Sequence, residues 1–135
     1  MNRWLIPILG VVLWASCIAP LRSEGLKVNA IRFWSYEETT RIAIEVSGDF
    51  QYRLGERLHN PERVFFDIRN TKPGLNGKKV GTTEVNDKLV SRIRVAETLP
   101  GVTRVVIDLT GPAECHATQI ANPDRLMIEV RRSPG

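Results

Sequence analysis

The chain repeats itself, because three segments of its first half return in the same order in its second half. They are residues 28–32 (VNAIR), 41–48 (RIAIEVSG) and 60–69 (NPERVFFDIR), with counterparts at 90–94 (VSRIR), 104–111 (RVVIDLTG) and 122–131 (NPDRLMIEVR). The offset between the copies stays at 62 or 63 residues. A match kept over three separate segments indicates a duplication, so the two halves should adopt equivalent structures and offer equivalent surfaces.

Both copies alternate apolar and polar side chains. In residues 41–46, 63–68 and 104–109, every second side chain is apolar and most of those between are charged. A period of two over this length indicates β-strands with one buried face. The expected strands lie near residues 28–34, 40–47, 50–58 and 63–69 in the first copy, and near 89–96, 103–110, 113–120 and 125–131 in the second.

Turn residues separate these strands. Asn60-Pro61 and Asn122-Pro123 precede the last strand of each copy, where asparagine and proline both favour a turn. Residues 71–88 join copies at about 28–69 and 90–131, and we expect a loop there with one short edge strand. We predict an all-β fold, a small β-sandwich of two symmetry-related sheets, in which each copy forms one four-stranded meander and the two bury their apolar faces together.

The N-terminus has the pattern of a secretory signal peptide. Arg3 precedes an apolar run at residues 4–19, and small and polar residues continue to Ser23. We therefore expect residues 1–23 to be cleaved off, leaving a domain at 26–132 and a tail or linker start at 133–135. An uncleaved membrane anchor is the alternative, but the run is shorter than the ~20 residues that a spanning helix needs.

Cys17 allows a second kind of processing. Residues 13–17 (LWASC) resemble a bacterial lipoprotein box, although Trp14 stands where that pattern normally has an aliphatic residue. Lipidation at Cys17 would bring the protein to a membrane. If Cys17 instead leaves with the signal peptide, Cys115 is a lone thiol and no internal disulfide can form.

The charge balance argues against a nucleic-acid partner. The formal net charge of +4 falls to about +2 once Arg3 and Arg22 are removed with the signal peptide. No run of lysine or arginine stands out in the remaining sequence. Instead, arginines recur at equivalent positions of the two copies.

The ordered motifs resemble the AMIN domain. They are an Ile-Arg-aromatic opener, Thr-Arg with alternating apolar residues and Ser-Gly, and Asn-Pro-x-Arg before a strand that ends in Asp-Ile. The resemblance covers about residues 26–132 and both copies carry it. It implies a bacterial periplasmic module of two small symmetric sheets, placed ahead of zinc N-acetylmuramoyl-L-alanine amidase domains or in pilus secretins. It also implies peptidoglycan as the ligand, and a role in localising the attached protein in the envelope, often at the division site.

The outward-facing positions supply the candidate ligand-binding residues. Arginine forks match the stem carboxylates of peptidoglycan, and exposed apolar or aromatic side chains suit a sugar face. By alternation, the candidates are Arg32, Trp34, Arg41, Arg63 and Phe65 in the first copy, and Arg94, Arg104, Arg125 and Met127 in the second. The competing role for the arginines is structural: Arg41 with Glu45, or Arg63 with Asp67, would join cross-strand charge ladders.

The sequence gives little support for catalysis or for a cofactor. His59 and His116 occupy non-equivalent places in the repeat, and there is no H-E-x-x-H motif for a metal site. Cys115 and His116 are neighbours on one expected strand, so their side chains should point to opposite faces and cannot form a dyad. We expect a binding module without enzymatic activity.

Two alternatives to peptidoglycan binding follow from the sequence. An open sheet edge would accept a strand from a secretin or divisome partner, which makes the domain a protein adaptor. In the second alternative, the chain is the N-terminal fragment of a zinc amidase whose catalytic domain follows Gly135.

Overall fold

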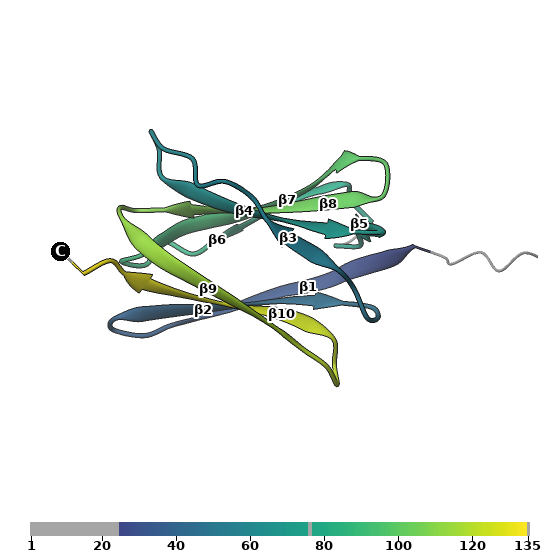
Figure 1. Cartoon of the computed structure of the whole chain (residues 1–135), viewed down its shortest axis with the longest axis horizontal. Helices are drawn as coiled ribbons and strands as arrows, with labels where there is room; N and C mark the ends of the chain where they lie inside the picture. The colour runs from purple at the N-terminus through teal and green to yellow at the C-terminus, as the bar shows by residue number, and fades with distance from the viewer. Residues whose placement is uncertain (1–24, 76, 135) are drawn as a thin grey trace, which may run out of the picture.

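The computed structural model describes residues 25–75 and 77–134, which form two stacked five-stranded sheets (Figure 1). The ten strands are β1 (Leu26–Ser35), β2 (Thr39–Val46), β3 (Tyr52–Leu54), β4 (Arg63–Arg69), β5 (Thr71–Pro73), β6 (Val80–Glu84), β7 (Val90–Leu99), β8 (Val102–Leu109), β9 (Ala113–Ile120) and β10 (Arg125–Arg132). The predicted all-β sandwich is confirmed. The predicted signal peptide and Cys17 lie outside the described residues.

The two copies exchange strands. Sheet I has the order β5-β1-β2-β10-β9 and sheet II the order β3-β4-β8-β7-β6, so each sheet combines the first two strands of one copy with the last two of the other. The prediction of one meander per copy was therefore wrong. Alternation determines which face of a strand is buried, but any antiparallel neighbour can satisfy the same backbone hydrogen bonds. After β2 the chain crosses between the layers, where Phe50 is buried.

The duplication is nevertheless visible in the structure. Strands β1, β2, β3 and β4 correspond to β7, β8, β9 and β10, and the central pairs β2–β10 and β8–β4 are both antiparallel. Asn60 and Asn122 both adopt φ of 60°, and each precedes a cis proline. The Asn-Pro segments are turns, as the sequence predicts.

The copies differ in their third strand and in the segment that joins them. Strand β3 covers only Tyr52–Leu54, whereas the sequence predicted residues 50–58. Beyond Leu54 the pairing with β4 is irregular and continues through a hydrogen bond from the Gly55 amide to the Phe65 carbonyl and a bridge between Leu58 and Arg63. The ring of Phe65 fills the space beside Gly55, where an added Cβ would lie 2.0 Å from a ring carbon. The joining segment holds two edge strands instead of one, because β5 pairs parallel with β1 and β6 pairs antiparallel with β7.

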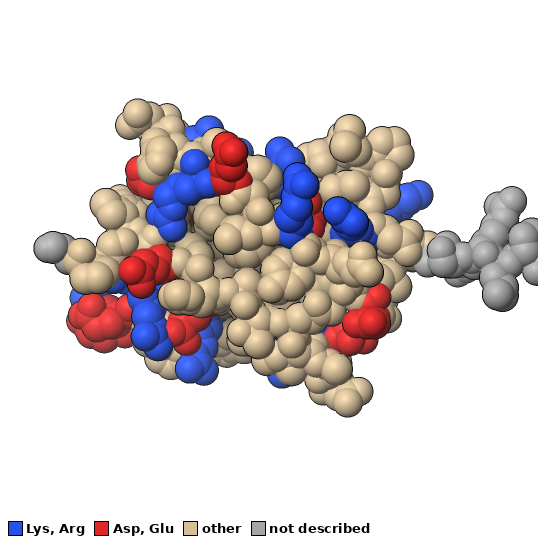
Figure 2. Space-filling model, viewed as in Figure 1, with Lys and Arg blue, Asp and Glu red and all other residues tan. Residues whose placement is uncertain are grey.

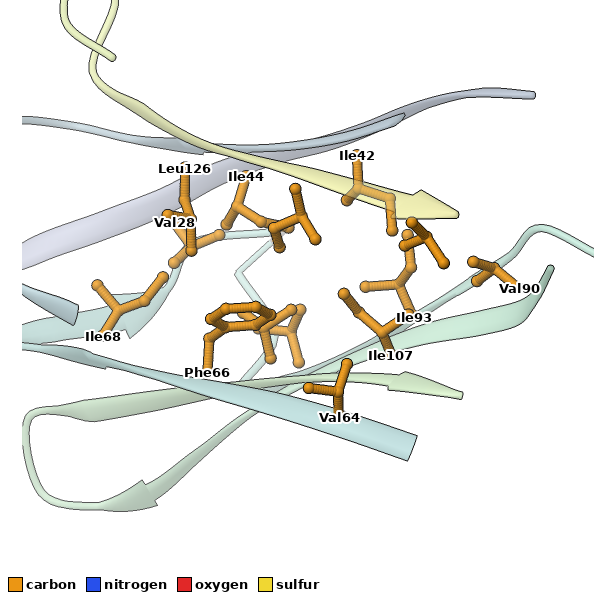
Figure 3. Close-up of a cluster of buried hydrophobic side chains, with 14 of the residues drawn as sticks. Val28, Ile42, Ile44, Val64, Phe66, Ile68, Val90, Ile93, Ile107 and Leu126 are labelled. Carbon is orange, nitrogen blue, oxygen red and sulfur yellow. The ribbon is translucent and has the colours of Figure 1, made fainter. Parts of the chain in front are cut away.

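The core lies between the sheets and contains residues of both copies. Figure 3 shows Ile42, Ile44 and Leu126 of sheet I directed toward Phe66 and Ile107 of sheet II, and all five are at most 1% exposed. Burial of one such side chain stabilises the fold by about 1.5–3 kcal/mol. Nowhere in the described part of the chain does a helix have the length and apolarity to cross a membrane.

Candidate functional site on the outer faces of the sheets

The nine predicted ligand-binding residues are divided between the two outer faces of the sandwich. The outer face of sheet I carries Arg32, Trp34, Arg41, Arg125 and Met127, and that of sheet II carries Arg63, Phe65, Arg94 and Arg104. The sheets cover each other's inner faces, so these two groups point in opposite directions. A single small ligand cannot contact both groups.

On sheet II the arginines are held by carboxylates of the protein. Arg104 donates two hydrogen bonds to Asp67, of 2.8 and 3.0 Å, and Arg94 donates two to Asp108, of 2.8 and 2.7 Å. Hydrogen bonding to Asp67 is the main reason that the pKa of Arg104 is raised. In each of these two-pronged pairs, a carboxylate of the protein occupies the guanidinium N–H groups that a ligand carboxylate would need.

Phe65 completes a closed cluster with Arg104 and Asp67 on this face. The Arg104 Cζ atom lies 4.1 Å from the centre of the Phe65 ring, and the ring also lies against Gly55. The Arg104 guanidinium and the Phe65 ring therefore form a cation–π contact. Phe65 packs within the protein here and offers little free ring surface to a ligand.

Arg63 and Arg125 have the same local role in their two copies. Each donates a hydrogen bond of 2.8 Å from Nη1 to the carbonyl oxygen of the proline two residues earlier, Pro61 and Pro123 respectively. The arginine of the Asn-Pro-x-Arg motif therefore braces its own turn. This contact accounts for arginine at that position in both copies without any ligand.

Sheet I presents a more open outer face. Strand register places Trp34, Arg41, Glu129 and His116 side by side across β1, β2, β10 and β9. The Nε atom of Arg41 lies 3.7 Å from Glu129 Oε2, too far for a hydrogen bond, and 54% of its side chain is exposed. Trp34 is 43% exposed, in agreement with an outward position. Arg32, by contrast, resembles its counterpart, because it bonds to Glu45 as Arg94 bonds to Asp108.

Two shallow depressions flank the Arg41–Glu129 pair. One, of about 400 Å³, lies over β10 and β9, and the other, of about 320 Å³, lies toward the β1–β2 turn. Their lining adds eight residues that the sequence analysis did not select as ligand-binding, which are Tyr36, Thr39, His116, Thr118, Ile120, Ile128, Glu129 and Arg131. Extending the alternation by one step from Trp34, Met127 and Glu129 would have found Tyr36 and Arg131.

The predicted charge ladders form, but with different partners. Arg41 was expected to join a ladder with Glu45 of its own copy, whereas the carboxylates beside Arg41 and Arg104, Glu129 and Asp67, come from the other copy. The reason is the strand exchange, which places β10 beside β2 and β4 beside β8. Figure 2 accordingly shows acidic and basic side chains interspersed on the visible surface, without one continuous basic area.

The remaining polar candidates lie apart from these faces or from one another. Cys115 packs toward the core, and burial raises the pKa of its thiol to about 11, while His116 is exposed on the outer face. His59 forms a 2.6 Å hydrogen bond with Glu62 in the β3–β4 connection. Within residues 25–75 and 77–134, no group of three or more His, Cys, Asp or Glu side chains could hold a metal ion.

Comparison with known proteins identifies the family. No curated protein matches the chain. The model of the AMIN domain matches residues 30–132, which include nearly all of both sheets. The chain therefore belongs to the AMIN domain family.

Proposed function

We propose that this domain binds peptidoglycan without cleaving it, and so holds its protein at the cell wall. Membership of the AMIN family supports a cell-envelope targeting module of the kind found in amidases and secretins. The family also supports a non-catalytic role. The signal peptide predicted at residues 1–23 supports export to the periplasm, where peptidoglycan lies.

One structural observation carries the proposal beyond the family, and it is the outer face of sheet I. Exposed aromatic rings at Trp34 and Tyr36 lie beside the Arg41 guanidinium, which donates no hydrogen bond to any residue that the structure describes. Peptidoglycan combines sugar rings, which stack on aromatic side chains, with stem carboxylates, which pair with arginine. This face therefore offers both kinds of contact within one surface.

The test is co-sedimentation of the domain with purified sacculi. The proposal predicts a saturable isotherm for residues 24–135, weakened by added salt because charged contacts contribute. Sacculi stripped of their stem peptides, and chitin particles, serve as matched insoluble controls. Sedimentation that rises linearly with protein concentration, without saturation, would refute specific binding.

A second candidate function, that of a protein adaptor, is favoured by the free edge of sheet I. Strand β9 is eight residues long and, within residues 25–75 and 77–134, pairs with β10 alone, whereas its counterpart β3 has three residues. A long open edge accepts a strand from another protein through backbone hydrogen bonds. Glu114→Pro, at a β9 position that lines neither depression, would separate the two functions: the adaptor loses its protein partner, and sacculus binding is retained.

A further inference from the structure

The two outer faces began as copies of one surface, and their chemistry now differs. Across the equivalent row of strands, sheet I carries Trp34, Arg41, Glu129 and His116, whereas sheet II carries Ala96, Arg104, Asp67 and Arg53. The arginine is kept in both rows. Its aromatic neighbour is present in sheet I only, and its carboxylate partner is one methylene longer there.

The different carboxylates leave the two arginines in different states. Both carboxylate oxygens of Asp67 accept hydrogen bonds from Arg104. In contrast, the Glu129 carboxylate lies within hydrogen-bond distance of Arg131 Nε, and 3.7 Å separate it from Arg41 Nε. Among the described residues, none accepts a hydrogen bond from the Arg41 side chain. An exposed guanidinium in this state can receive an external carboxylate in the two-pronged geometry that Asp67 gives Arg104.

The surroundings of Arg41 limit the kind of ligand that fits. The Tyr36 ring lies on one side, with its centre 5.9 Å from Arg41 Cζ, and the depression that contains Met127, Thr118 and Ile120 lies on the other. At the equivalent of Met127, sheet II has Phe65, which its own cluster covers. The two depressions share Arg41 and Glu129 and together form what we call the sheet I groove, which has an aromatic end, a cationic centre and an apolar end.

The charge of the groove favours an anionic ligand. Arg41 and Arg131 carry two positive charges against the single negative charge of Glu129, and all three line the depression beside Tyr36. One ligand carboxylate would balance the excess. A neutral N-acetyl sugar chain would use the aromatic end and leave the cationic centre without a partner.

We propose that sheet I alone carries the binding site, and that its ligand is the stem peptide of peptidoglycan, with a free carboxylate on Arg41 and small aliphatic side chains against Met127 and Ile120. This inference rests on the proposed peptidoglycan binding and adds the face, the chemical class and a stoichiometry of one ligand for each chain. Sheet II, where Arg94 and Arg104 are engaged by Asp108 and Asp67, serves the stability of the sandwich.

Calorimetric titration with soluble probes tests the inference. The probes are a free tetrapeptide stem, the same stem with its terminal carboxylates amidated, and chitotetraose. The wild-type domain should bind one stem peptide, and amidation should weaken binding about tenfold or more, the scale of a lost hydrogen bond between charged groups. Tighter binding of chitotetraose than of the stem would overturn the proposal.

Equivalent positions in the duplication give a matched pair of variants. Arg41→Gln should weaken stem binding about tenfold or more and leave the melting temperature unchanged. Arg104→Gln should keep the wild-type affinity and lower the melting temperature. Equal loss of affinity in both variants, or two stems bound for each chain, would refute a single site on sheet I.

Failure of this inference can be told apart from failure of the proposed function. Sacculi bound by a domain that does not bind the stem would overturn the stem site and leave peptidoglycan binding intact. Sacculi not bound at all would overturn both. Binding of an unrelated acidic tetrapeptide as tight as that of the stem would show a general carboxylate site and refute recognition of the stem.

Discussion

Thr40 and Thr103 occupy equivalent positions of the two copies, but their hydroxyl groups differ in hydrogen bonding. Both side chains are buried, at 1% and 0% exposure. The Thr40 hydroxyl donates a 2.6 Å hydrogen bond to Asp87, whereas among the described residues the Thr103 hydroxyl has no partner. The same substitution by valine, which keeps the shape and removes the hydroxyl, should therefore have opposite effects at the two sites.

The expected magnitudes follow from the contacts. Thr40→Val removes a hydrogen bond to a charged group and should lower the free energy of unfolding by about 1.5–2 kcal/mol. Asp87 keeps the Ser35 hydroxyl and two backbone amides, which places the effect near the low end of that range. Thr103→Val removes a buried hydroxyl without a partner and should raise the free energy of unfolding by about 1 kcal/mol.

Urea unfolding at neutral pH, followed by tryptophan fluorescence, measures both effects. The two variants should differ by about 2.5–3 kcal/mol, a large part of the stability of a domain of this size. A destabilised Thr103→Val variant would refute the assignment of an unsatisfied hydroxyl. Equal effects at both sites would refute the contribution of the Asp87 contact.

The Asp87 contact also predicts a dependence on pH. Burial acts to raise the pKa of Asp87, but hydrogen bonds from hydroxyl and amide groups outweigh it and hold this pKa below its ordinary value of 3.8. A carboxylate whose pKa is lowered on folding stabilises the fold above the unfolded pKa, and this contribution is lost as pH falls through the folded pKa. The cost of Thr40→Val should therefore be complete at neutral pH and shrink below pH 3.8. A cost that is constant down to pH 2 would contradict this.

Three further predictions concern packing, reactivity and the aromatic surface. Gly55→Ala should destabilise the domain by about 1–3 kcal/mol in thermal melts, because its Cβ would overlap the Phe65 ring, and Gly111→Ala, with open space around it, is the matched control. Cys115 should react with iodoacetamide more slowly than a free thiol at mildly alkaline pH, since burial raises its pKa to about 11; rapid alkylation of the folded domain would contradict its packing toward the core. Trp34→Ala should leave the melting temperature within a few degrees of wild type and weaken sacculus binding, because the ring is 43% exposed; a large loss of stability with unchanged binding would assign it to the fold.

The faces of the strands could be predicted from the sequence, and their partners could not. Alternation correctly placed Arg41 and Trp34 outward and Ile42 and Ile44 inward, because a period of two determines the face of a strand. The partner of Arg41 depends on which strand lies beside β2, which is decided by the crossing of the chain after Val46. Local sequence carries no signal for that crossing.

Because strand partners could not be predicted, the outer faces of sheets I and II looked alike in the sequence. Arg41 and Arg104 stand at equivalent positions, and only the exchanged strands bring Glu129 to one and Asp67 to the other. The difference of one methylene between these carboxylates matters only once they face an arginine across the sheet. Gly55, which allows Phe65 to close over Arg104, is likewise informative only after β3 and β4 are paired.

The central claim is that the domain binds peptidoglycan on the outer face of sheet I, and mapping of backbone amide shifts by NMR tests it most directly. Soluble muropeptides released from sacculi would be titrated into the ¹⁵N-labelled domain. The account predicts saturable shifts at Arg41, Met127 and Glu129, with the amides of Phe65, Asp67 and Arg104 unmoved. Shifts centred on those sheet II residues, or none on either face, would contradict it.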